Sequence, residues 1–159
     1  MGTTFVSVSP GVDVPGFWLR DGILELWLRF LALHVEDPTS SGTVATTIRD
    51  QWLLASRGYF NGCVPHGMKD AVASEEGAKI VREAIAALLK SLATGPALIS
   101  AGTLNLMGFS GSPFVNEIEA WRLTEISEAF LDLLDGKITE GPRSKEFMPG
   151  CRERQTSRR

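Results

Sequence analysis

The sequence predicts an all-α fold, an irregular bundle of four to five helices. Three segments repeat large apolar residues at intervals of three and four, the period of an amphipathic helix; they fall within residues 21–36, 74–93 and 113–136. Only residues 3–16 alternate apolar and polar residues, and they do so weakly. A chain of 159 residues with 43% hydrophobic content is enough for one domain with a buried core.

The first segments differ in their local signals. Residues 1–17 carry two Pro-Gly pairs, so we expect an extended N-terminal arm with at most one short strand. From Asp21 the helical period begins, and Asp21 is a suitable N-cap. Apolar residues occupy so much of this helix that it should be the central and most buried one. Asp37-Pro38 ends it, because the residue before proline is pushed out of the helical region.

Three further helices and a short one follow. A second helix should run from a Thr43 cap to a stop at Gly58, and a third should open at Ser74 and end before Pro96. Residues 97–107 are predicted to form a shorter apolar helix. The last long helix is predicted to start near Pro113, after a Ser112 cap, and to reach Gly136.

The composition changes after residue 136. We therefore predict a single helical domain over 1–136 and a flexible basic tail over 137–159, where few large apolar groups remain to offset the entropy of ordering. The tail has a formal charge of +4, which leaves −7 on the domain. A domain this acidic repels phosphate backbones, so the sequence predicts no nucleic-acid partner.

Membrane insertion and secretion are not indicated. The longest apolar run, Ile23 to Val35, covers 13 residues and is interrupted by Glu25 and Arg29. A bilayer requires about 20 residues, so no membrane segment is predicted. Only two cysteines are present, 88 positions apart, which favours a reducing, cytoplasmic location over a disulfide framework.

The loop from Gly58 to Gly67 is the first candidate site, because it holds the only tyrosine, one of two cysteines and one of two histidines. Cys63 and His66 have C-x-x-H spacing, so one hypothesis is a small enzyme or metal-binding domain centred on them. In that case Asp70 or Glu75 would be the orienting carboxylate. The structural alternative is a packed cysteine and a capping histidine. A zinc site needs a second ligand pair that the chain lacks, so neither a metal nor a cofactor is predicted.

An acidic ridge on the last helix is the second candidate site. At 100° per residue, four carboxylates fall on one outward arc, and Trp121 lies within the same arc; the four are Glu125, Glu128, Asp132 and Asp135. Such a ridge is either a solvated helix face or a docking surface for a basic protein. In the second case Trp121, and Tyr59 from the loop, would be the aromatic anchors.

In size, charge and lack of a completed catalytic motif, the chain resembles the small acidic cytosolic immunity proteins that neutralise bacterial toxins. This resemblance implies a non-enzymatic protein-binding domain. It further implies that a basic toxin is steered onto the acidic ridge and held there by aromatic anchors.

Overall fold

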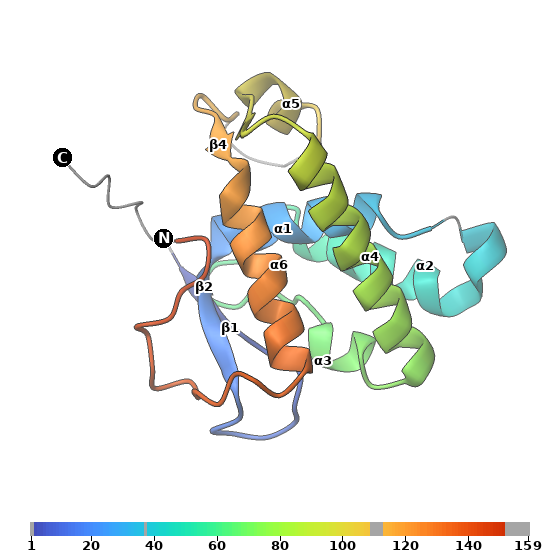
Figure 1. Cartoon of the computed structure of the whole chain (residues 1–159), viewed down its shortest axis with the longest axis vertical. Coiled ribbons are helices and arrows are strands. Elements are labelled where there is room, and N and C mark those ends of the chain that lie inside the picture. The colour runs from blue at the N-terminus through green and yellow to red at the C-terminus, as the bar shows by residue number, and fades with distance from the viewer. Residues whose placement is uncertain (1, 37, 109–112, 152–159) are drawn as a thin grey trace.

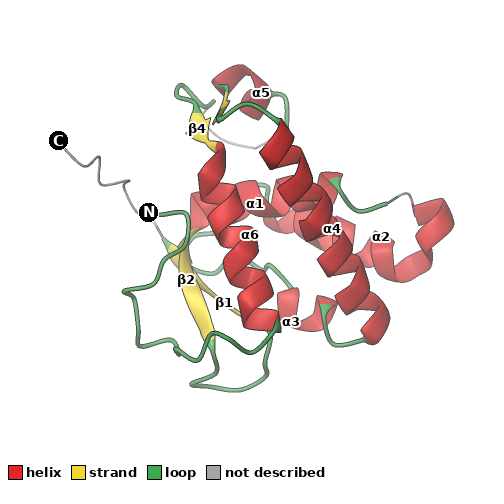
Figure 2. Ribbon diagram, viewed as in Figure 1, coloured by secondary structure: helices red, strands yellow, loops and turns green. Residues whose placement is uncertain are grey.

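The computed structural model describes residues 2–36, 38–108 and 113–151, with only the backbone described for 38–41. Within these ranges the chain forms six helices and four short strands, the strands making two separate antiparallel pairs (Figures 1 and 2). The fold is therefore mixed α/β, and the all-α prediction is wrong. None of the described helices is both long and apolar enough to cross a bilayer.

The N-terminal residues form a β-hairpin instead of a free extended arm. Strand β1 (Thr3–Ser7) pairs with β2 (Gly16–Arg20), in a register that sets Phe5 opposite Trp18. The ring centroids of this pair are 5.4 Å apart. Cross-strand aromatic contacts of this kind stabilise a two-stranded sheet, which explains why a weakly alternating sequence pairs here.

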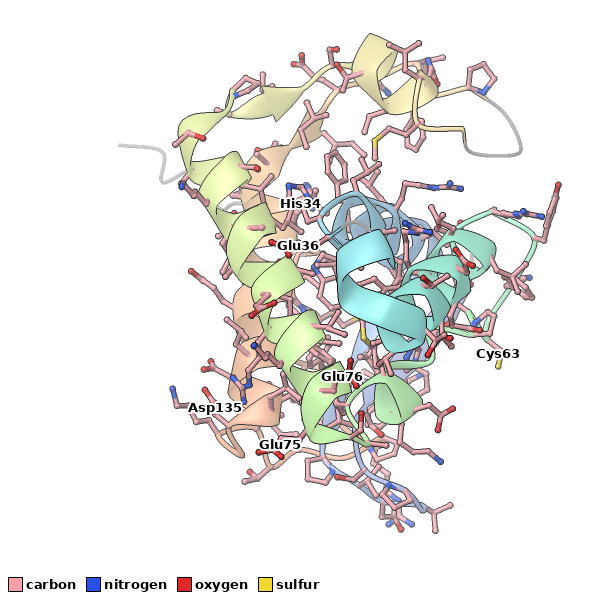
Figure 3. The ribbon with its side chains drawn as sticks, turned by 90° about the vertical axis from the view of Figure 1, so that its right-hand side faces the viewer. His34, Glu36, Cys63, Glu75, Glu76 and Asp135 are labelled. Atoms are coloured by element: carbon pink, nitrogen blue, oxygen red, sulfur yellow. The ribbon has the colours of Figure 1, made fainter. Side chains whose placement is uncertain are left out.

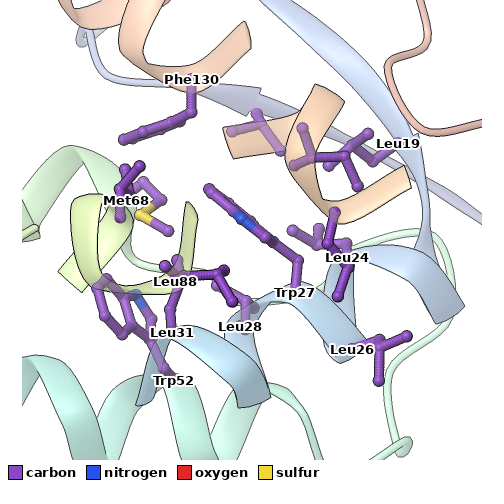
Figure 4. Packing of buried hydrophobic residues seen from close by; sticks show 14 of the residues in the cluster. Leu19, Leu24, Leu26, Trp27, Leu28, Leu31, Trp52, Met68, Leu88 and Phe130 are labelled. Carbon is purple, nitrogen blue, oxygen red and sulfur yellow. The ribbon is translucent and has the colours of Figure 1, made fainter. Parts of the chain in front are cut away.

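Helix α1 (Asp21–Leu33) continues directly from β2 and lies at the centre of the molecule, as predicted. The indole of Trp27 is fully buried and packs beside the ring of Phe130 (Figure 4), with their ring centroids 5.4 Å apart. It donates a hydrogen bond to Ser127 Oγ at 3.0 Å. Asp21 does not cap the helix as predicted: the residue before the helix is Arg20, and no side chain caps it.

Two long helices cover α1, and both were predicted. Helix α4 (Glu75–Thr94) begins after Ser74, whose Oγ accepts a hydrogen bond from the backbone N–H of Gly77. Helix α6 (Ala120–Leu134) lies beside α4, as Figure 1 shows. Their apolar faces pack on α1, so the three helices enclose the core.

Helix α2 (Pro38–Ala55) starts earlier than predicted. It is interrupted at Gly42, whose φ of 71° and ψ of −162° are not helical, so it consists of two helical stretches. Glycine adopts this conformation at low cost because it has no Cβ. A single turn of helix, α3 (Met68–Ala71), follows the 58–67 loop and was not predicted.

The segment between α4 and α6 departs most from the sequence prediction. The helix expected at 97–107 is a two-residue strand, β3 (Leu98–Ile99), followed by the short helix α5 (Ala101–Asn105). Strand β3 pairs with β4 (Ile118–Glu119), and this pairing delays the start of α6 to Ala120. The predicted cap at Ser112 lies outside the described residues.

The chain after α6 lies along the β-hairpin. The backbone N–H of Gly16 donates to Glu140 O at 2.9 Å, and the indole N–H of Trp18 donates to Pro142 O at 2.7 Å. These bonds satisfy polar groups on the outer edge of β2. Residues 137–151 therefore act as a cover for this edge.

A flexible tail was predicted for residues 137–159. Its described part, 137–151, is packed against the hairpin: the ring of Phe147 meets that of Phe17 edge-on, with centroids 6.1 Å apart. Residues 152–159 lie outside the described part of the chain. The segment is held by hydrogen bonds to its backbone groups, by the Phe147–Phe17 pair and by Ile138, which is buried in the core.

Candidate functional site

The loop between α2 and α3 is anchored to the hairpin and to α1. Asp21 is buried, and its carboxylate accepts hydrogen bonds from Thr4 Oγ1 and from the backbone N–H of Gly62, both at 2.7 Å. Thr4 Oγ1 in turn accepts from the backbone N–H of Val64 at 2.9 Å. A buried carboxylate is stabilised by such donors. The loop is thus held by Thr4 and Asp21, which lie 60 and 41 residues before the loop residues that they bind.

His66 is used by this loop as a structural group. Its Nε2 lies 3.2 Å from Phe5 O, and its Nδ1 accepts from the backbone N–H of Met68 at 3.1 Å. The two contacts fix a neutral ring with the proton on Nε2. Burial lowers the pKa of His66 below its ordinary value, although the bond to Phe5 opposes that shift.

Cys63 is exposed and, in the described structure, makes no hydrogen bond to His66. A general base needs a free ring nitrogen directed at the thiol, and both nitrogens of His66 are occupied by backbone groups. Asp70 lies in α3, is exposed, and makes no hydrogen bond to His66 within the described structure. The arrangement does not favour the Cys63, His66 and Asp70 hypothesis. No group of three His, Cys, Asp or Glu side chains suited to a metal ion occurs among the described residues.

The acidic ridge divides into two parts. Glu125 is half-buried, and its Oε2 accepts a hydrogen bond from the backbone N–H of Gly150 at 2.7 Å. Arg122, one turn earlier, donates to Gly150 O at 2.9 Å. Glu125 therefore belongs to the contact between α6 and the C-terminal segment, and it is not available as an open docking carboxylate.

The remaining three carboxylates, Glu128, Asp132 and Asp135, stay at the surface, and we call them the α6 acidic face. Asp132 pairs with Lys137 at 3.4 Å and Asp135 with Arg82 at 2.9 Å. Their side chains are nevertheless 50% and 41% exposed. Glu128 is exposed and has no ion pair or hydrogen bond within the described residues.

The two aromatic residues predicted as anchors are placed differently from that expectation. Trp121 is half-buried, with the guanidinium of Arg122 4.8 Å from its ring centroid. Tyr59 is 69% exposed, but it belongs to the same loop as Cys63. Figure 3 shows Cys63 and Asp135 on opposite sides of the molecule. The loop and the α6 acidic face therefore do not form one surface.

Glu25 is a buried carboxylate that sequence reasoning missed. It lies one turn after Asp21 on α1 and is only 8% exposed. Burial, together with the negative charge of Asp21, raises the pKa of Glu25 to about 7. Its i, i+4 spacing from Asp21 was a signal in the sequence. In the sequence, Glu25 was considered only as a charge that interrupts the apolar run from Ile23 to Val35.

A cavity of about 360 Å³ lies between α2 and residues 67–74. Its volume is within the range of small-molecule sites. The apolar part of its wall comes from Val44, Ile48 and Trp52 on α2 and Ala71 on α3. Sequence reasoning did not find it, because α3 was not predicted and the two walls are separated by the loop.

No family model, curated protein or solved structure matches this chain. Its function is therefore inferred from the arrangement of its own residues.

Proposed function

We propose that the protein is a non-catalytic binding domain that recognises a basic protein through the α6 acidic face. The observation that supports it best is the state of Glu128, which is exposed and uncompensated beside two half-exposed carboxylates. The formal charge of −3 over the whole chain adds long-range attraction for a basic partner.

The ion pairs already present on this face do not prevent binding. Exposed pairs such as Lys137–Asp132 contribute only about 0–1 kcal/mol, because both groups remain hydrated. A lysine or arginine of a partner can replace them at little cost. Desolvation in the complex would then strengthen the new pairs and set the orientation of docking.

The likeness to immunity proteins rests on size and charge, and it is the charge that favours a basic protein as the partner. We propose a reducing cytoplasm as the location, since Cys63 and Cys151 are free and Cys63 is exposed.

The test begins with capture of binding proteins from source-cell lysate on immobilised full-length chain. The captured protein is then purified and its association rate measured against salt concentration. Glu128→Lys with Asp132→Lys should slow association about tenfold or more and flatten its salt dependence.

The matched control is Glu36→Lys with Glu117→Lys. Both residues are exposed and lie outside the α6 acidic face, and the change in net charge is identical. If both double variants slow association equally, only net charge matters, and the proposed face is wrong. A partner whose rate is indifferent to salt would also contradict the proposal.

A further inference from the structure

The cavity between α2 and residues 67–74 has a polar rim, and some of the hydrogen-bond donors on this rim are already used within the protein. Gln51 directs its Nε2 to Pro65 O at 2.5 Å, which uses a donor and leaves the amide oxygen as an acceptor. Thr47 donates its hydroxyl to the carbonyl of Thr43 at 2.8 Å. Two rim donors are therefore occupied, Gln51 Oε1 keeps its acceptor capacity, and the hydroxyls of Thr43 and Ser74 can donate or accept.

Of the described side chains that line the cavity, Asp70 alone is ionisable. Within the described part of the chain its carboxylate has no hydrogen bond or ion pair. Among the described residues no lysine, arginine or histidine contributes to the lining, so the carboxylate of Asp70 gives this part of the cavity a negative charge. An anionic ligand is disfavoured, and a cation that donates hydrogen bonds is favoured.

The walls below the rim are apolar. Val44 and Ile48 supply aliphatic surface, and the fully buried Trp52 closes the inner end. A fully hydrated inorganic cation would gain nothing from these groups. A ligand with an apolar body and one charged end would bury its body here while its charge stays at the rim.

We propose that this cavity binds a small organic cation, with a primary ammonium group against Asp70 and Gln51 Oε1 and an apolar body against Ile48 and Trp52. This activity is separate from recognition of a basic protein by α6. It uses α2 and α3, which take no part in the α6 acidic face.

The position of the cavity also links ligand binding to the 58–67 loop. Gly67 has a φ of 64° and packs so closely on Gln51 that an added Cβ would lie 2.9 Å from Gln51 Cγ. Gln51 thus contacts both the end of the loop and the cavity. A ligand that binds the amide oxygen of Gln51 should therefore change the environment of its amide N–H, which donates to Pro65 O.

The experiment uses the ¹⁵N-labelled full chain titrated with 2-phenylethylammonium chloride at constant ionic strength. We expect saturable shifts of the Gln51 side-chain amide and the Trp52 indole N–H signals. Neutral 2-phenylethanol and anionic 3-phenylpropionate have similar apolar bodies. Each should bind at least tenfold more weakly than the ammonium probe, because a tenfold change is about what the loss of one charge-assisted hydrogen bond causes.

Two variants and one control variant locate the site. Asp70→Asn keeps the shape of the side chain and should weaken binding of the ammonium probe about tenfold, whereas Glu76→Gln, an exposed carboxylate outside the lining, should not. Thr47→Phe places a ring from an exposed position into the cavity and should abolish binding.

Circular dichroism first confirms that each variant is folded. Equal affinity for 2-phenylethanol and the ammonium probe would overturn the proposal. So would equal effects of the Asp70 and Glu76 substitutions, or unchanged binding in Thr47→Phe. If Thr47→Phe does not fold, the Asp70 and Glu76 pair still decides the outcome.

Discussion

The carboxylate of Glu125 accepts a hydrogen bond from the backbone N–H of Gly150, with 2.7 Å between Oε2 and N. Arg122 bonds the carbonyl of the same glycine, so α6 holds both polar groups of this residue. Gly150 has a φ of 71°, and an added Cβ would lie 2.7 Å from Arg122 O. Only glycine fits here without displacement. This contact docks the C-terminal segment.

Replacement of Glu125 by alanine should release residues 147–151. The backbone N–H of Gly150 would lose its charged acceptor, and we expect a stability loss of about 1–2 kcal/mol. Hydrogen exchange of these residues should become faster. Glu128→Ala, one turn away and exposed, is the control and should have little effect. Unchanged protection in Glu125→Ala would show that the clamp does not hold the segment.

Asp21→Asn should lower the free energy of unfolding by about 1–3 kcal/mol, because its amide cannot accept from both Thr4 and Gly62 without turning an N–H toward a donor. Urea denaturation measures this loss. Asp50→Asn replaces an exposed carboxylate and should be nearly neutral. Equal effects of the two substitutions would mean that the buried array contributes no stability.

The stability of the protein should depend on pH through Glu25. Its pKa is about 7 in the fold, above the ordinary 4.5, so the folded state holds the proton more tightly than the unfolded chain. Its contribution is complete below about pH 4.5 and is lost as the pH rises through 7. Glu25→Gln should remove this dependence. At pH 8 the variant should be more stable than the natural chain by about 1–2 kcal/mol, which partial hydration keeps below the full linkage value.

The measurement is a series of urea denaturations from pH 4 to pH 8 on both proteins. A natural chain that gains stability relative to Glu25→Gln as the pH rises would contradict the prediction.

His66 should have the opposite effect. Burial lowers its pKa in the fold, so the unfolded chain binds the proton more readily. The contribution of His66 is therefore present above its ordinary pKa and is lost as the pH falls through the lowered value. Nitrogen NMR should show a neutral ring protonated on Nε2, donating to Phe5 O. A ring protonated on Nδ1 at pH 7 would exclude the bond from the Met68 N–H.

Cys63 should be chemically accessible and structurally dispensable. Its side chain is exposed, so a thiol reagent should modify it in the folded protein faster than the half-buried Cys151. Cys63→Ala should change stability by less than about 0.5 kcal/mol. His66→Ala should cost about 1–3 kcal/mol, because two backbone groups lose their partner. A large loss of stability in Cys63→Ala would contradict the structural dispensability of this thiol.

The long helices could be predicted because their signal is local. The apolar residues of α4, such as Val81, Ile85 and Leu88, recur within one or two turns, and burial of that face follows wherever the helix packs. The central position of α1 could be predicted for the same reason, since an almost wholly apolar helix must be covered on all sides. The helix starts differ: the third helix was predicted to open at Ser74, where the structure has its N-cap, whereas the predicted Asp21 cap is wrong.

The strands depend on partners that are distant in sequence. Leu98 pairs with Glu119 across 20 intervening residues, and neither two-residue strand has a pattern long enough to detect. The hairpin needed the Phe5–Trp18 contact, and its outer edge needed the C-terminal segment. Composition could not show that this segment would be packed by backbone bonds.

The sequence by itself determined the helical period, the net acidity and the ridge of carboxylates on α6. Only the tertiary structure decided which of these carboxylates is open: Glu125 bonds Gly150, whereas Glu128, one turn later, remains at the surface. The same holds for the 58–67 loop, where contacts with Phe5 and Met68 made His66 a structural group. A local sequence pattern determines which face of a helix a side chain occupies. Packing between segments that are distant in sequence determines which atoms contact that side chain.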